Sequence, residues 1–223
     1  MQGLRIYPVY KPLKVPCDSS QGPPDQYQTY TNLTSFRNGA HGIFNKEGGA
    51  IRLKHFKLMG NGADDERRVK LKDVYGPPAH QPNSEGNLYV RDPDEPTVAR
   101  SSGKVGLFAP QDEYYYGKDL TFVGYGSGAI AGCAKCGSQT DMKQGGYTFR
   151  LSGLKFYNTT KKVRFTVPFK QIFQDDDGSL TGTAGGWATA YRAFNVWPGQ
   201  CERKGEEFDT GIVCDNTVKV RRL

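Results

Sequence analysis

The sequence predicts an all-β protein, and three observations support this class. Glycine and proline are frequent, with 28 and 13 residues in a chain of 223, and both favour turns. Short alternating runs recur, as in segment 162–167, where Val163, Phe165 and Val167 alternate with polar residues. Runs of Ala, Leu, Glu or Lys at helical spacing are few.

Taken in order, the chain divides into an N-terminal segment, a repetitive body and a terminal cap. Residues 1–28 are rich in proline and predict an extended segment followed by a loop. Residues 29–200 predict stacked strands, with a protruding polar loop at 76–102. Residues 201–223 predict a disulfide-closed cap strand. The expected strands are 30–36, 50–58, 68–74, 86–90, 104–108, 119–125, 147–156, 162–167, 171–174 and 217–222.

Two all-β architectures fit this pattern. In the first half the runs begin roughly 15–30 residues apart, which is typical of a solenoid of stacked coils such as a right-handed parallel β-helix. A β-sandwich would instead use tight hairpins of the Asn-Gly or Asp-Gly type. Asn38-Gly39, Asn61-Gly62 and Asp177-Gly178 are present, so the pattern alone leaves both architectures open.

Composition narrows the function classes. No apolar stretch is long enough to span a membrane, and residues 1–17 lack the apolar core of a signal peptide. The net charge of +7 is compatible with nucleic acid, an anionic polysaccharide or an acidic membrane surface. Because the basic residues are spread along the chain, we favour a solvated β surface and expect no nucleic-acid partner. P-loop, GxGxxG and GxSxG motifs are absent.

Five cysteines are compatible with disulfides in an oxidising compartment. Cys133 and Cys136 form a CxxC pair, but a second CxxC for zinc and a helix start for a thioredoxin-like motif are both missing, which favours a structural disulfide. Cys201 and Cys214 fit a loop-closing disulfide worth roughly 3 kcal/mol. Cys17 is then left for a partner elsewhere.

Two further features could carry chemistry. Asp175, Asp177 and Ser179 place oxygens at alternate positions around Gly178, as in the first half of a calcium loop. The same side chains could instead cap a turn, and a residue completing an EF-hand loop is missing. We expect no cofactor other than this candidate Ca²⁺. Sequons at Asn32 and Asn158 predict N-glycosylation.

Six short segments stand out in the second half of the chain: CAKC at 133–136, QGGYT at 144–148, GLKF at 153–156, DDDGSLTG at 175–182, GIVC at 211–214 and KVRRL at 219–223. In these segments the chain resembles the fibrocystin (polyductin) and fibrocystin-like family, and the resemblance extends over most of the chain. Before residue 133 the resemblance is diffuse. Hyaluronan-degrading cell-surface proteins share the same segment.

The resemblance implies the C-terminal part of a right-handed parallel β-helix. It also implies a structural or adhesive role, without catalytic residues, at the extracellular or ciliary surface. The rest of a longer polypeptide, neighbouring subunits and anionic glycans are the partners it suggests. The alternative that it leaves open is a calcium-dependent enzyme that degrades a hyaluronan-type polysaccharide.

Overall fold

A computed structural model describes a chain that is almost entirely β-structure. The residues that it describes are 3–10, 27–36, 41–48, 50–60, 105–109, 115–125, 128–131, 147–165, 171–190, 200–209 and 211–218. Within these ranges the one helical segment is a short 3₁₀ turn, η3 (Gly205–Glu207). No helix in the described part of the chain has the length and apolarity needed to cross a membrane. The all-β prediction is confirmed.

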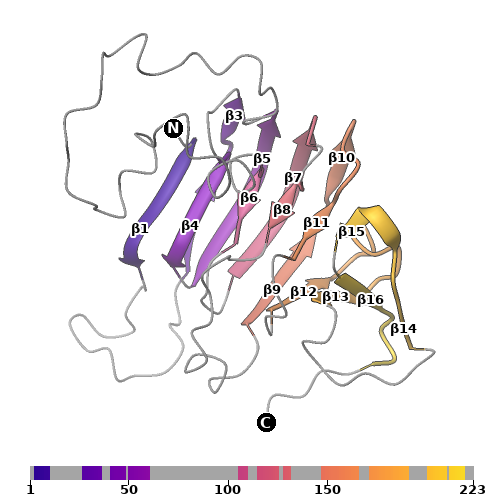
Figure 1. Ribbon diagram of the computed structural model, residues 1–223. Helices are drawn as coiled ribbons and strands as arrows, with labels where there is room; N and C mark the ends of the chain where they lie inside the picture. The colour runs from indigo at the N-terminus through magenta and orange to yellow at the C-terminus, as the bar shows by residue number, and fades with distance from the viewer. Residues whose placement is uncertain are drawn as a thin grey trace, which may run out of the picture.

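The strands form two sheets. The six-stranded sheet pairs every neighbour in parallel. Its order is β1 (Leu4–Tyr10), β4 (Ile43–Gly48), β6 (Leu107–Phe108), β8 (Ile130–Ala131), β11 (Val163–Arg164) and β15 (Phe208–Asp209). The colour gradient of Figure 1 runs across the stack from β1 to the yellow C-terminal strands, so spatial order follows chain order.

The ten-stranded sheet is mixed. Its parallel part contains β2 (Gln28–Thr31), β5 (Ile51–Met59), β7 (Tyr115–Val123), β9 (Tyr147–Ser152) and β12 (Gln171–Asp175), with β3 (Thr34–Phe36) beside β5 and β10 (Lys155–Tyr157) beside β7. An antiparallel end follows, made of β13 (Trp187–Ala190), β16 (Gly211–Cys214) and β14 (Cys201–Glu202).

The chain passes back and forth between the two sheets. From β4 to β9 every successive strand lies in the other sheet and pairs in parallel with its counterpart from the previous passage. Antiparallel pairing begins only after β12. Neither sheet closes on itself, and each begins with an N-terminal strand, β1 or β2, at its edge.

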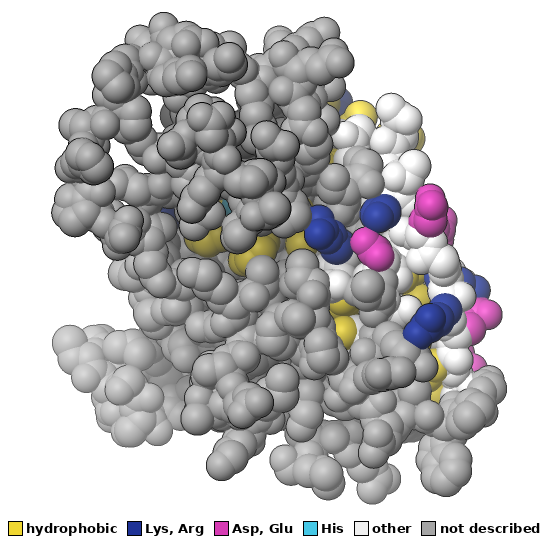
Figure 2. Space-filling view, viewed as in Figure 1, with side chains coloured by type: hydrophobic (Ala, Val, Ile, Leu, Met, Phe, Trp, Pro, Cys, Tyr) yellow, Lys and Arg dark blue, Asp and Glu magenta, His cyan; other side chains and the backbone are white. Residues whose placement is uncertain are grey.

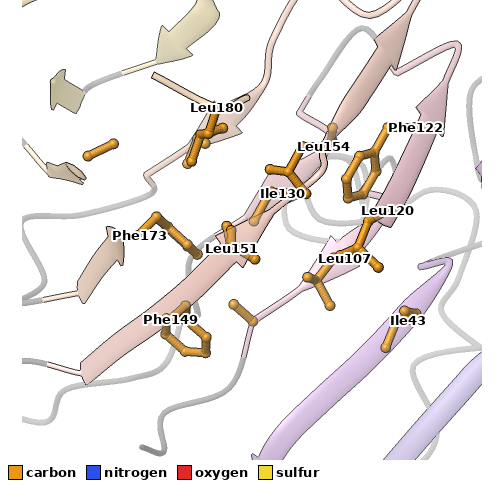
Figure 3. Close-up of a cluster of buried hydrophobic side chains, with 14 of the residues drawn as sticks. Ile43, Leu107, Leu120, Phe122, Ile130, Phe149, Leu151, Leu154, Phe173 and Leu180 are labelled. Carbon is orange, nitrogen blue, oxygen red and sulfur yellow. The ribbon is translucent and has the colours of Figure 1, made fainter. Parts of the chain in front are cut away.

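The apolar core lies between the sheets. In β5, Ile51 and Leu53 are buried whereas the intervening Arg52 is partly exposed, as expected when successive side chains point to opposite faces. Phe149 stacks near Phe173 with ring centroids 5.3 Å apart. Burying each such side chain contributes about 1.5–3 kcal/mol. Figure 3 shows this cluster of buried side chains, in which Leu107, Leu120, Phe122, Ile130, Leu151, Leu154 and Leu180 are also labelled.

The local expectations can be compared with the structure segment by segment. The proline-rich segment 1–28, expected as extended chain and loop, contains the edge strand β1, whose register shifts between Ile6 and Val9, around Pro8. Residues 217 and 218 lie in a turn and a bend rather than in the expected strand 217–222. The expected strands 68–74 and 86–90 and the loop 76–102 lie outside the described residues.

Candidate functional site

The Asp175–Ser179 loop is a closed hydrogen-bonded turn that follows β12. The fully buried carboxylate of Asp175 accepts hydrogen bonds from the backbone N–H groups of Gly178, Leu180 and Thr181 at 2.6–3.0 Å. The hydroxyl of Thr181 donates a fourth hydrogen bond, at 2.8 Å. Asp175 therefore holds the turn together from inside.

Asp177 and Ser179 attach this turn to the previous passage of the chain. The Asp177 carboxylate accepts hydrogen bonds from the N–H of Gly153 at 2.7 Å and from the hydroxyl of Ser179 at 2.6 Å. The Ser179 hydroxyl in turn accepts one from the N–H of Leu154 at 2.9 Å. Asp176, between Asp175 and Asp177, forms an exposed ion pair with Arg150 at 3.0 Å. Each of the three aspartates thus has a protein partner.

The two carboxylates of the turn have opposite pKa shifts. Burial raises the pKa of Asp175 above its usual range, against the hydrogen bonds from Thr181 and Leu180. For Asp177 burial acts in the same upward direction, but hydrogen bonds from Ser179 and Gly153 outweigh it and lower the pKa. The Asp177 site therefore favours an ionised carboxylate.

These contacts favour the turn-capping interpretation of the loop. The oxygens of Asp175, Asp177 and Ser179 that a calcium ion would need already accept hydrogen bonds. Among the described residues, no group of three or more His, Cys, Asp or Glu side chains is placed to hold a metal. Calcium binding at this loop stays a prediction.

The corners of the stack form two columns with left-handed backbone. Asn32, His55, Asp119 and Gly153 have φ of 58°, 58°, 55° and 65° and lie one above another in the register of β2, β5, β7 and β9. The second column contains Gly60, Gly124 and Asn158, with φ of 46°, 73° and 46°. Sequence reasoning missed both columns, because their members are different residue types far apart in the chain.

Both sequon asparagines lie in these columns and are exposed. Asn32 and Thr34 are exposed at the start of the first column. Asn158 and Thr160 are exposed at the end of the second, where the hydroxyl of the intervening Thr159 donates to the carbonyl of Tyr157. Glycosylation of Asn32 and Asn158 stays a prediction, and the geometry leaves both sites accessible.

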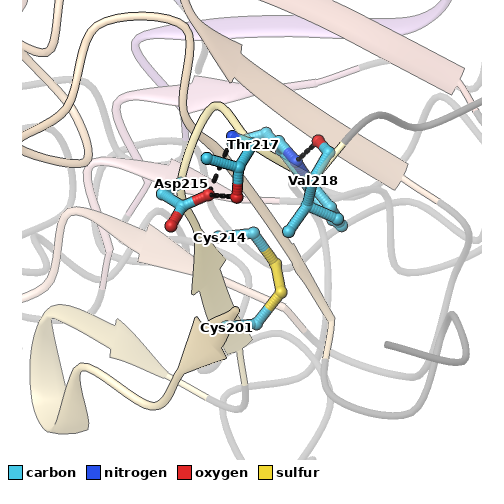
Figure 4. The surroundings of a disulfide bond; sticks show 6 residues. Cys201, Cys214, Asp215, Thr217 and Val218 are labelled. Carbon is cyan, nitrogen blue, oxygen red and sulfur yellow. Dashed lines mark hydrogen bonds between the residues drawn. A yellow bond between two sulfur atoms is a disulfide. The ribbon is translucent and has the colours of Figure 1, made fainter. Parts of the chain in front are cut away.

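The structure contains the Cys201–Cys214 disulfide, which joins directly opposed residues of β14 and β16. Figure 4 shows it beside the turn in which Thr217 donates to the carboxylate of Asp215. The indole N–H of Trp187 donates to the carbonyl of Val218 at 2.8 Å, which fastens this turn over the end of the sheet. Cys133 and Cys136 lie outside the described residues.

Basic side chains gather on the outer side of the ten-stranded sheet, although they are dispersed in the sequence. We call this set the outer basic face, and it consists of Arg52, Lys54, Lys57, Lys118, Arg150 and Lys155. Elsewhere charges are mixed: in the view of Figure 2 basic and acidic side chains lie next to one another on the described surface. Lys161 and Asp209 form one such ion pair, with Nζ of the lysine 3.1 Å from Oδ2 of the aspartate.

Comparison with known proteins gives one partial similarity. Mouse fibrocystin (Mus musculus) is 33% identical to this chain over 122 residues, which cover 53% of this chain. The aligned segment spans 3% of the length of fibrocystin. No protein-family model matches the chain, and no solved structure matches it. The similarity supports a fibrocystin-like relationship for about half of the chain.

Proposed function

We propose that this chain is a structural and adhesive segment of a fibrocystin-like protein at the extracellular or ciliary surface, built as a right-handed parallel β-helix. The observation that carries the proposal is the alternation of successive strands between two parallel stacks. In such an arrangement backbone hydrogen bonds run along the length of the stack. A rod built this way holds its surface side chains at fixed spacing.

The connections between successive passages support this mechanical role. Backbone bonds at the corners join neighbouring passages, as from the N–H of Gly60 to the carbonyl of Val123 at 2.8 Å, and from that of Gly124 to Tyr157 at 2.9 Å. The Asp177 turn adds side-chain bonds to Gly153. At the N-terminal end, the edge strands β1 and β2 offer positions where the rest of a longer polypeptide or a neighbouring subunit would extend the stack.

Three observations support a location outside the cell. The chain is similar to fibrocystin over about half of its length, and the resemblance implies a surface protein. The Cys201–Cys214 disulfide is typical of an oxidising compartment. The exposed sequons at Asn32 and Asn158 are accessible to the glycosylation machinery.

The decisive experiment is antibody labelling of intact cells from the organism that makes the protein, with and without permeabilisation. We expect labelling without permeabilisation. Mass spectrometry of the isolated protein under non-reducing conditions should then find glycans on Asn32 or Asn158 and an oxidised Cys201–Cys214 pair. Labelling only after permeabilisation, with unmodified asparagines and free thiols, would contradict the proposal.

A further inference from the structure

The outer basic face is created by the register of parallel strands. Lys54 lies directly opposite Lys118, and Arg52 is opposite Tyr116, which is opposite Arg150. Beyond the first corner column, which contains His55 and Asp119, Lys57 and Lys155 lie opposite Thr121 on its two neighbouring strands. These side chains alternate with buried ones, such as Leu53 and Leu58, so they point away from the core.

The charge on this face is largely uncompensated. Three acidic groups border it: Asp119 lies 3.3 Å from His55, Asp176 pairs with Arg150, and the exposed Asp177 accepts a hydrogen bond from the N–H of Gly153. Among the described residues, none of the lysines of the face forms an ion pair. Like charges directly opposite one another destabilise a sheet, so the Lys54–Lys118 pair opposes folding unless a negative partner covers it.

Aromatic rings hold the arginines of this face in place. The guanidinium of Arg52 lies 4.2 Å from the ring centroid of Tyr27 and 5.6 Å from that of Tyr116. Arg150 lies 5.9 Å from the same Tyr116 ring. Cation–π contacts of this kind restrict the guanidinium without using its N–H donors. The N–H groups of Arg52 are thereby presented for bidentate hydrogen bonds to an oxyanion.

An apolar column with exposed ends and a half-buried middle runs beside the lysines. Phe36, Met59, Val123 and Tyr157 occupy equivalent positions on neighbouring strands. Phe36 and Tyr157, at its two ends, are 60% and 55% exposed. A partner with both anionic groups and apolar ring faces fits this combination.

We propose that the outer basic face binds a sulfated polysaccharide. Neighbouring strands lie about 4.8 Å apart, so Lys54 and Lys118 concentrate positive charge in a way that suits closely spaced sulfates. The choice of a glycan rests on the proposed function, which places the chain outside the cell. There nucleic acid is scarce, and the anionic lipid leaflet faces the cytoplasm instead.

The test measures binding of the full chain to a labelled, size-defined heparin oligosaccharide by fluorescence anisotropy at several salt concentrations. The K54Q/K118Q variant should raise the Kd about tenfold and reduce the salt dependence, because fewer counterions are exchanged. The K161Q/K162Q variant removes the same charge at residues that pair with Asp209 and Glu207, and it should change the Kd less than about twofold. Circular dichroism confirms that both variants are folded.

Three results would overturn the inference. Equal weakening in both variants shows a net-charge effect rather than a site. Unchanged binding in K54Q/K118Q removes the face from the interaction. Tighter binding to single-stranded DNA or to phosphatidylserine vesicles than to heparin overturns the choice of a glycan. The cell-labelling experiment is independent, so surface labelling without face-dependent heparin binding rejects this inference and leaves the proposed function standing.

Discussion

At the residue scale, the left-handed corners impose the sharpest constraint on sequence. Gly153 has a φ of 65°, and a Cβ at this position would lie 2.3 Å from Oδ1 of Asp119. Gly205 has a similar φ of 60°, with nothing within 4 Å of its would-be Cβ. Gly205→Ala should therefore lower the free energy of unfolding by about 1 kcal/mol, which is the backbone cost alone. Gly153→Ala should lower it by about 2–4 kcal/mol, because the new Cβ would also lie 3.1 Å from the backbone N and 3.3 Å from the Cα of Asp119, which move less easily than its carboxylate.

Urea unfolding of both variants beside the wild type measures the difference. The Gly205→Ala variant is the matched control for backbone conformation. Equal losses in the two variants would mean that the Asp119 side chain moves aside freely, and that the corner column is not a close-packed feature.

A second residue-scale prediction concerns the Asp177 turn. Asp177→Ala removes the hydrogen bonds to Gly153 and Ser179 and should lower the free energy of unfolding by about 1–2 kcal/mol. Asp176→Ala is the control in the same turn and should cost less than about 1 kcal/mol, since only an exposed ion pair with Arg150 is lost.

The effect of Asp177 should depend on pH. Its pKa in the fold is lowered below the ordinary 3.8, so its stabilising contribution is complete above that pH and is lost as pH falls through the folded-state pKa. The difference between wild type and Asp177→Ala should therefore shrink on acidification below about pH 4. The turn-capping interpretation predicts that added Ca²⁺ leaves both melting temperatures unchanged. A rise of several degrees in the wild type alone would confirm the calcium prediction instead.

At the element scale, most strands could be located from the sequence, although their bounds could not. β5 alternates with period two on each side of His55 and nearly coincides with the expected strand 50–58, whereas the expected strand 119–125 covers only the second half of β7. β6 and β11, with two residues each, lie inside the expected strands 104–108 and 162–167, whereas β8 lies in no expected strand and is defined by its pairing with β6 and β11. No local pattern encodes such pairing.

The same limit applies to the candidate sites. The Asp175–Ser179 loop was visible because its oxygens lie at consecutive alternate positions. The outer basic face was not visible in the sequence, because its lysines are dispersed along the chain. The dispersed lysines favoured the interpretation of a solvated β surface instead. Residues 54 and 118 become neighbours only through the register of β5 and β7, which places the apolar residues of both strands on the core face. The outer basic face could therefore be found only once the pairing of the strands was known.

The terminal cap provides an element-scale prediction. The disulfide links β14 to β16 across 13 residues, so its reduction should lower the free energy of unfolding by about 3 kcal/mol. The measurement is chemical denaturation with and without dithiothreitol. A Cys201→Ala/Cys214→Ala double variant is the control, and it should start less stable and lose nothing more on reduction. If the double variant responds to dithiothreitol like the wild type, the effect arises from other cysteines.

At the scale of the whole molecule, stacking predicts that stability varies along the chain. β5 and β7 have hydrogen-bonded neighbours on both sides, whereas β1 has only β4. In a stack each passage contacts mainly its neighbours, so disturbances fade with distance. Amide exchange measured by mass spectrometry should therefore be slowest at 51–59 and 115–123 and faster at 4–10.

Reduction of the disulfide tests how far a disturbance travels through the stack. It should accelerate exchange in the peptides that cover β14 and β16, because these strands lose their covalent link. Exchange in β5 should stay unchanged, since β7, β9, β12 and β13 lie between it and β16 in the sheet. Uniform rates along the chain, or an equal acceleration in β5, would instead show a single cooperative unit. Such a result would argue against the proposal that a longer polypeptide or a neighbouring subunit extends the stack at β1 and β2, because that proposal assumes passages that interact mainly with their neighbours.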